Sequence, residues 1–340
     1  MAGLIALLVA SAAAAGAVAP GSLTLYVTSP GSTGIWAVDA ATGDRVLHEV
    51  GSWPVVIALH HATALADGTL LLESTNAVQR RNILRYDPAR GVLTGVSGQV
   101  DPGSDETRGA GPSLDPGATA LLATRGGALL YLRRGAGPMR VDLWTGDRSV
   151  VSQSADPAVG SGFPMTRPLD LVFESDATVF VADAFEGLVR VRLADGGREL
   201  AHPGTSFIEG PYLLDLLPDG RLVHAHGLES SNALYAFDPA TGRDTLLSGL
   251  GRGDGELFVS IHDLVVAPNG LVYVYDTVPP TVLAVDPATG DRTVVSGGRD
   301  GRGAGFELPG ILDRPLLATF SPPARPADPR PIRRRLQAAP

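Results

Sequence analysis

Three residues that can bind a metal ion stand at the same distance before a glycine in different parts of the chain. His60, Tyr212 and His262 each precede a glycine by eight residues. Two imidazoles and a phenol that converge can hold a divalent cation. The spacing therefore predicts a metal site, provided that the fold brings the three segments together. The alternative is that the three side chains are polar groups solvated by ordered water.

Further potential ligands lie next to this set. His61 and Asp263 each directly follow one of the two histidines, and His224 and His226 belong to a neighbouring segment. The chain contains no cysteine, which excludes a thiol nucleophile, disulfides and zinc bound through thiolates. It contains no lysine either, which excludes Schiff-base chemistry and a P-loop.

A repeated phrase positions these residues. The segment from Val285 to Ser296 is nearly the same as that from Phe237 to Ser248, and weaker copies lie upstream. Each copy contains one turn glycine, and successive turn glycines are 46 to 55 residues apart. They are Gly43, Gly91, Gly146, Gly196, Gly242 and Gly290. This period is typical of a β-propeller blade, so the sequence predicts an all-β, six-bladed propeller.

Each repeat predicts four short strands. In the last one, apolar runs at 261–266, 271–276, 282–285 and 293–295 are separated by turn residues. The first repeat supplies only three strands, at 23–29, 35–39 and 45–50, and residues 311–320 align with the first strands of the other repeats. We therefore expect a 3+1 closure, in which a carboxyl-terminal strand completes the amino-terminal blade and covers the free sheet edges.

The two ends of the chain differ from the repeats. Residues 1–19 contain an apolar run too short to span a bilayer comfortably, which predicts a signal peptide or a short anchor. The propeller is expected over 20–320 and a disordered Pro/Arg-rich tail over 321–340. The protein is predicted to be periplasmic or secreted, with no stable transmembrane domain. A net charge of −9 with scattered arginines argues against nucleic-acid binding.

The segments from Arg167 to Val172 and from Val179 to Asp183 resemble the NHL repeat, with a proline-led first strand and a Val-Ala-Asp second strand. Gly-rich stretches before an aromatic, as at 251–258, also resemble the loops that introduce NHL blades. The resemblance implies the NHL and gluconolactonase-like superfamily of six-bladed propellers. That superfamily includes binding scaffolds, calcium-dependent lactonases and amidating lyases, which are similar in using channel histidines to bind zinc.

Glu209-Gly210-Pro211 resembles the tripeptide that opens gluconolactonase-like propellers, in which the glutamate ligates calcium. Here the tripeptide enters the fifth blade instead of the first. Asp170, Asp263 and Asp313 stand at entrances of first strands and can supply further oxygen ligands. The alternative is a glutamate solvated in a loop. The tripeptide that begins at Arg252 matches a cell-adhesion motif, but its repeat partner at 302–305 explains it as part of a Gly-rich linker.

Two functions follow from these patterns. The first is a binding scaffold for a protein or a glycan, acting through interblade loops on a rigid ring. The second is a metal-dependent lactonase or lyase with Ca²⁺ or Zn²⁺ at the mouth of the central channel, held by His60, His262, Tyr212 and Glu209. The loops concerned are 98–116, 152–166, 202–211, 249–260 and 298–309.

Overall fold

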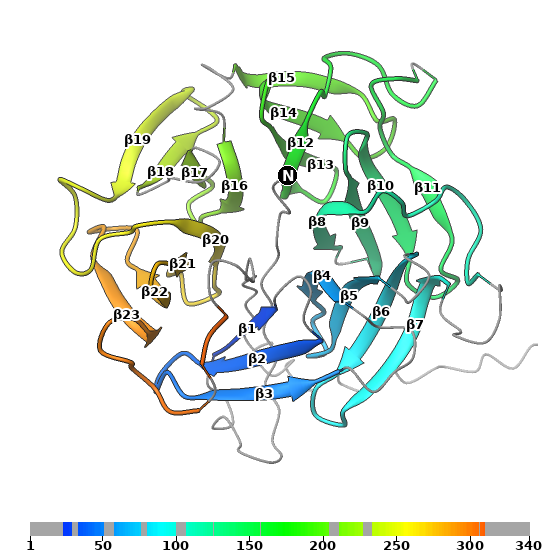
Figure 1. The fold of residues 1–340 in the computed structure, drawn as a ribbon. Helices are drawn as coiled ribbons and strands as arrows, with labels where there is room; N and C mark the ends of the chain where they lie inside the picture. The colour runs from blue at the N-terminus through cyan, green and yellow to red at the C-terminus, as the bar shows by residue number, and fades with distance from the viewer. Residues whose placement is uncertain are drawn as a thin grey trace, which may run out of the picture.

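The computed structural model shows six antiparallel sheets arranged as blades around a central axis (Figure 1). It describes residues 23–28, 33–50, 58–75, 80–99, 107–124, 126–156, 158–203, 211–226, 233–305 and 307–309. All the regular elements in these ranges are strands. The predicted six-bladed, all-β propeller is therefore confirmed.

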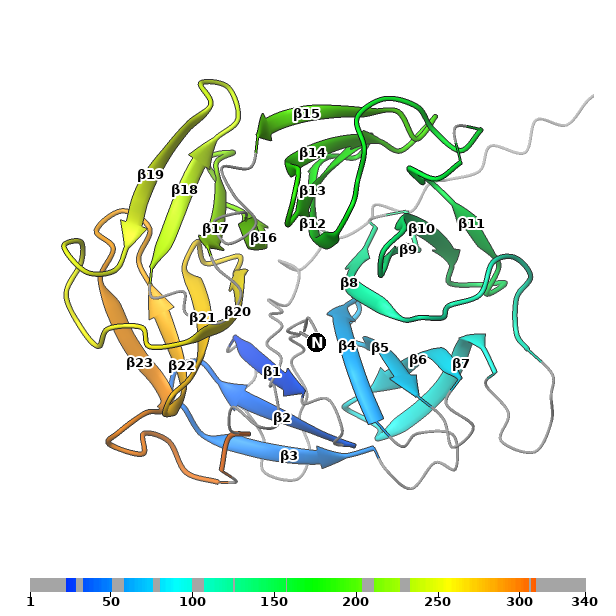
Figure 2. The ribbon, with the colours of Figure 1, turned by 45° about the horizontal axis from the view of Figure 1, so that its top comes forward.

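The blades follow the chain, and within each blade the strands run in order from the centre to the perimeter (Figure 2). Blade 1 comprises β1 (Thr24–Thr28), β2 (Gly34–Asp39) and β3 (Arg45–Glu49). Blade 2 comprises β4 (Ala58–Ala64), β5 (Leu70–Thr75), β6 (Arg81–Asp87) and β7 (Val92–Gly98). Blade 3 comprises β8 (Ala118–Ala123), β9 (Ala128–Arg133), β10 (Gly137–Asp142) and β11 (Arg148–Val150).

Blades 4 to 6 complete the ring. Blade 4 comprises β12 (Pro168–Ser175), β13 (Thr178–Asp183), β14 (Gly187–Arg192) and β15 (Arg198–Pro203). Blade 5 comprises β16 (Pro211–Leu216), β17 (Leu222–His226), β18 (Leu234–Asp238) and β19 (Arg243–Ser248). Blade 6 comprises β20 (Ile261–Val266), β21 (Val272–Thr277), β22 (Pro280–Val285) and β23 (Arg292–Gly297).

The repeated phrase forms the outer turn between the third and fourth strands. In blade 6 the carboxylate of Asp286 accepts a hydrogen bond from the Ala288 N–H, and Gly290 has a φ of 87°. In blade 1 Asp39 accepts from the N–H groups of Ala41 and Thr42. A carboxylate that caps the turn and a glycine with positive φ make a tight connection between antiparallel strands.

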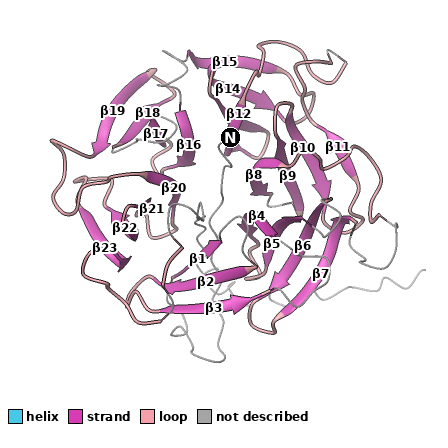
Figure 3. Ribbon diagram, viewed as in Figure 1, coloured by secondary structure: helices cyan, strands magenta, loops and turns pink. Residues whose placement is uncertain are grey.

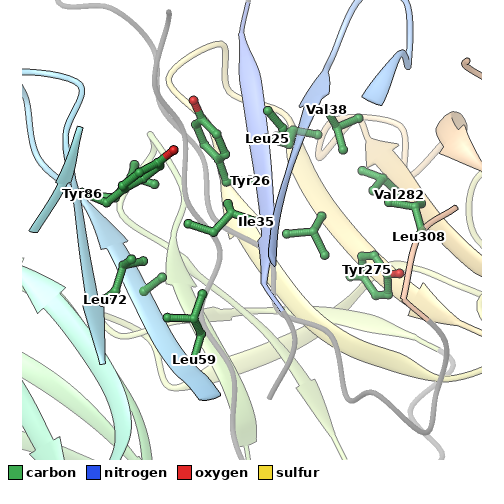
Figure 4. Packing of buried hydrophobic residues seen from close by; sticks show 14 of the residues in the cluster. Leu25, Tyr26, Ile35, Val38, Leu59, Leu72, Tyr86, Tyr275, Val282 and Leu308 are labelled. Carbon is green, nitrogen blue, oxygen red and sulfur yellow. The ribbon is translucent and has the colours of Figure 1, made fainter. Parts of the chain in front are cut away.

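The apolar core lies between blades, because each blade is covered on both faces by its neighbours. One cluster joins blades 6, 1 and 2, and includes Tyr26, Ile35, Leu72 and Tyr275 (Figure 4). The continuous apolar runs in the sequence are thus inner strands with two buried faces.

The amino-terminal blade has three strands, as expected, in the order β1-β2-β3. The segment predicted to complete it, 311–320, lies outside the described residues, as do the predicted signal at 1–19 and the tail at 321–340. The 3+1 closure and the two terminal assignments stay predictions. No helix in the described part of the chain is long and apolar enough to cross a membrane. Figure 3 shows the same all-strand arrangement by element type.

Candidate functional site

Each four-stranded blade has a β-bulge near the start of its innermost strand. The register shifts by one residue between, for example, Leu59 and His61 in β4 and between Ile261 and Asp263 in β20. A bulge leaves one residue unpaired and re-aims its side chain. The five bulge residues are His60, Thr119, Leu169, Tyr212 and His262. The three residues singled out by their spacing therefore occupy equivalent places at one end of the innermost strands.

The predicted metal set is only partly visible. Glu209 and Asp313 lie outside the described residues, and Tyr212 is described only through its backbone in β16. Among the side chains that the structure describes, no three His, Asp or Glu groups are close enough to hold a metal ion together. Metal binding by His60, His262, Tyr212 and Glu209 thus stays a prediction.

His60 lies in a positively charged and partly buried corner of blade 2. Its Nε2 is 2.6 Å from the Thr75 hydroxyl. Burial lowers the pKa of His60 to about 3, and the positive charges of Arg81 and Arg134 lower it further in the same direction. The imidazole is therefore neutral at pH 7, so that it can accept a hydrogen bond or bind a cation.

Behind His60 lies a polar cluster centred on Glu73 between blades 2 and 3. Glu73 is fully buried, and its Oε1 accepts hydrogen bonds from the Ala118 N–H at 3.0 Å and from the Tyr131 hydroxyl at 2.6 Å. The Nη1 of Arg81 is 3.9 Å from Oε1, and the Nε2 of the buried His61 is 3.9 Å from Oε2. The cluster therefore brings an acid, two bases and a phenol together inside an apolar interface.

Burial controls the ionisation of this cluster. It raises the pKa of Glu73, lowers that of His61 well below its ordinary value and raises that of Tyr131 well above. Within the described part of the chain, Glu73 Oε2 and His61 Nδ1 have no hydrogen-bond partner. Uncompensated polar atoms at such depth are costly, so the cluster is an exception in a ring held mainly by apolar contacts.

A pocket of about 480 Å³ opens next to this cluster. Arg81 connects the two, because its side chain lines the pocket while its guanidinium lies beside Glu73. Arg80, at the rim, is largely exposed and lies 3.8 Å from Asp115. The remaining lining residues are Gly98, Gln99, Thr107, Gly111, Ser113, Leu114 and Arg148. Two arginines and several uncharged hydrogen-bonding groups suit a small ligand that carries a negative charge.

A second, larger pocket of about 940 Å³ lies between blades 3 and 4, with Arg140 and Glu174 among its lining residues. Glu174 is already paired there, because both of its oxygens accept hydrogen bonds from Arg190, at 2.6 and 2.7 Å. This pocket offers less unused charge than the one beside Arg81.

The aspartates at the innermost strands connect blades. Asp170 of blade 4 accepts from the Leu214 N–H of blade 5 at 2.8 Å, and Asp215 of blade 5 accepts from the Val266 N–H of blade 6 at 2.6 Å. Burial raises the pKa of Asp170 to about 8 and that of Asp215 to about 6. Asp170, considered above as a calcium ligand, is thus engaged with backbone N–H groups, a role that its sequence position did not indicate.

Parts of the loops predicted to form a binding face pack against the ring. In the loop after blade 5, a Cβ built on Gly253 would overlap with the backbone of Gly290 in the outer turn of blade 6. The Asp254 N–H donates to the carboxylate of Asp291 in the same turn. Equivalent overlaps occur at Gly109, Gly160 and Gly303. These glycines therefore serve interblade packing, and Asp254 is engaged within the fold.

Sequence reasoning missed Glu73, Arg81 and Tyr131. Glu73 did give a signal, since a carboxylate that ends the run Leu70-Leu71-Leu72 interrupts an inner strand that is otherwise apolar. Its partner Tyr131 lies in the next blade, 58 residues away along the chain. No pattern within one repeat connects the two residues.

Comparison with known proteins supports the fold. A chain in the crystal structure of a nidogen/laminin complex is similar, with a TM-score of 0.58, 12% identity, and alignment over 87% of this chain and 96% of that chain. The structure of a streptogramin B lyase has a TM-score of 0.54 and 11% identity, over 90% and 84% of the two chains.

A third similar structure is the extracellular domain of a putative hybrid two-component system from B. thetaiotaomicron. Its TM-score is 0.51 and its identity 13%, and the alignment covers 83% of this chain and 36% of that one. No protein-family model and no curated protein sequence matches this chain. At these identities the likeness shows the propeller fold alone. One of these neighbours is part of a binding complex and another is a lyase, so the fold is compatible with both predicted functions.

Proposed function

We propose that this protein is an exported binding propeller that holds an acidic glycan in the pocket between blades 2 and 3. The observation that carries this proposal is the position of Arg81. Its side chain is about one-fifth exposed, with one side in the pocket and its guanidinium 3.9 Å from the buried Glu73. An arginine held from behind presents its planar donors to a ligand with little loss of side-chain entropy.

The charge balance favours an anion. Because burial raises the pKa of Glu73, the protonated acid is favoured, and the positive charge of Arg81 is then not fully compensated. Arg80 adds a second guanidinium at the rim. Carboxylates are bound by guanidinium groups through two parallel hydrogen bonds.

The uncharged lining favours a saccharide over an acidic peptide. Gln99, Thr107 and Ser113 carry donors and acceptors of the kind that hydroxyl groups pair with, and the volume suits one or two sugar rings. Export is supported by the apolar amino-terminal segment in the sequence and by a structural neighbour that is an extracellular domain. The ligand class that fits is a glycan containing uronic acid units.

Calorimetric titration with a galacturonic acid oligomer and with a neutral oligosaccharide of equal length tests this proposal. Selective binding of the acidic oligomer is expected, weakened about tenfold or more in Arg81→Gln and in Arg80→Gln. Arg140→Gln, in the other pocket, is the matched control and should bind normally. Equal affinity for the two oligomers, binding unaffected by both substitutions, or binding of an acidic peptide in place of the glycan would contradict the proposal.

The metal-dependent lactonase or lyase remains the second candidate. The observation that favours it is that His60, Tyr212 and His262 share one bulge position on the innermost strands. A neutral His60 is also in the protonation state that a metal ligand requires. The metal content of the purified protein separates the two candidates, as set out below.

A further inference from the structure

Four of the six junctions between blades are closed by the same pair of residues at the perimeter. An arginine that follows the outer turn of one blade donates from Nη1 to a serine Oγ of the preceding blade, at 2.6 to 2.8 Å. The serine in turn donates to the carbonyl of the turn glycine at 2.6 Å. We call this arrangement the latch. The pairs are Ser97 with Arg148, Ser152 with Arg198, Ser248 with Arg292, and Ser296 with Arg45.

The latch also holds the Gly-rich loop that crosses the junction. Between blades 5 and 6, the Arg292 N–H donates to the Asp254 carbonyl at 2.8 Å, and its guanidinium donates to the carbonyls of Gly253 and Glu256. The equivalent Arg148 is bonded in the same way to Ala110, Gly109 and Pro112. Each latch is thus a set of charge-assisted hydrogen bonds between two blades.

The other two junctions, between blades 1 and 2 and between blades 4 and 5, have different residues at these positions. Strand register places His48 and His202 where the serines stand, since they pair with Ile35 and Leu188 as Ser296 pairs with Val282. Leu93 and Asp244 stand where the arginines stand.

A change on the third strand accompanies this exchange. The residue paired with the latch arginine is always a valine: Val38, Val141, Val191 and Val285. In the two exceptional junctions it is Tyr86 or Phe237. The Tyr86 hydroxyl is 3.3 Å from His48 Nδ1 across the first junction, and the rings of His202 and Phe237 are 4.7 Å apart across the second. A histidine on an aromatic ring thus replaces the latch.

The exceptional junctions are also packed less closely at the turn. A Cβ built on Gly91 or Gly242 would have no atom within 4 Å, whereas one on Gly146 or Gly290 would overlap with a carbonyl of the preceding blade. At the innermost strands, however, Asp170 still connects blades 4 and 5 through the Leu214 N–H. The difference between the two kinds of junction therefore lies at the perimeter.

We propose that the ring consists of two three-blade units, blades 2–4 and blades 5, 6 and 1, which part at the perimeter of the two junctions without a latch. Two latched junctions lie between them on either side, so these junctions are opposite one another in the ring (Figure 2). Local opening follows the least stable contacts, and several charge-assisted hydrogen bonds are missing at these two places. Opening there would turn each unit about the innermost strands while its own latches stay closed.

Single cysteines can measure this opening, because the chain contains none. The first position of the second strand is fully buried in every four-stranded blade and faces the preceding blade. Leu70 and Leu222 report on the junctions without a latch, and Leu129, Val179 and Val272 report on latched ones. Native-state labelling with a thiol reagent should be about tenfold or more faster for Leu70→Cys and Leu222→Cys than for the other three.

Exchanging residues between junctions tests the cause. In the Leu222→Cys background, His202→Ser with Asp244→Arg should slow labelling, and in the Val272→Cys background, Ser248→Ala should accelerate it. Far-ultraviolet circular dichroism and the melting temperature identify any variant that does not fold, and the five single cysteines then carry the test alone. Equal labelling rates at the five sites, or rates that fall steadily with distance from the chain ends, would overturn the proposal.

Discussion

The carboxyl of Asp170 is the residue whose ionisation couples most directly to the ring. Burial raises its pKa to about 8, and its two oxygens accept backbone hydrogen bonds from Leu171 and from Leu214 of the next blade. The folded protein therefore keeps a proton on Asp170 at pH values where the unfolded chain has lost it. The stability contributed by this group is fully present below about pH 4 and is lost as the pH rises towards about 8.

We predict that Asp170→Asn reduces this pH dependence. The amide cannot ionise, so the difference in unfolding free energy between wild type and variant should change by on the order of 1 kcal/mol between pH 5 and pH 8. The wild type should lose stability relative to the variant as the pH rises. Urea unfolding at both pH values measures this, with Asp300→Asn on the surface as control. A difference that does not change with pH would contradict the prediction.

Metal binding is also decided at single residues. If the bulge residues hold an ion, protein purified without chelator should contain stoichiometric zinc or calcium, and the double variant His60→Ala/His262→Ala should lose it. Inductively coupled plasma mass spectrometry measures the content. Protein free of metal, with a melting temperature that added Zn²⁺ or Ca²⁺ does not shift, would rule out the lactonase or lyase.

Among the elements, the Gly-rich loops connect sequence pattern and packing. Gly251 and Gly253 lie in the same loop and both have positive φ, 90° and 77°. Only Gly253 is close to another backbone, that of Gly290. The repeated glycines in these loops therefore have two separable causes, backbone conformation and lack of space.

We predict that Gly253→Ala destabilises the protein by about 2 kcal/mol more than Gly251→Ala. Both variants strain the backbone, but only the first forces the loop away from blade 6. Chemical denaturation of the two variants under the same conditions gives the difference. Equal losses would show that the loop is not held against the turn as the structure has it.

The whole molecule depends on how the first blade is completed. Blade 1 has three strands in the described part of the chain, and a fourth, innermost strand is predicted at 311–320. A chain truncated before Ile311 should unfold at a lower temperature and associate, because it would leave two unpaired sheet edges. Calorimetry and light scattering test this, with truncation after residue 320 as control. A monodisperse protein with an unchanged melting temperature would refute the 3+1 closure.

The sequence by itself determined the blade count, the outer turns and the equivalence of His60, Tyr212 and His262. These features repeat within about 50 residues and depend on local preferences, such as the positive φ of Gly290 and the carboxylate of Asp286.

Only the tertiary structure decided which residues of different blades meet. It placed Tyr131 and Arg81 beside Glu73, and it showed that His48 and His202 stand where other blades have the serine of the latch. The physical reason is that contacts across a junction join positions tens to hundreds of residues apart. They depend on how two twisted sheets pack face to face, which no pattern within a single repeat encodes.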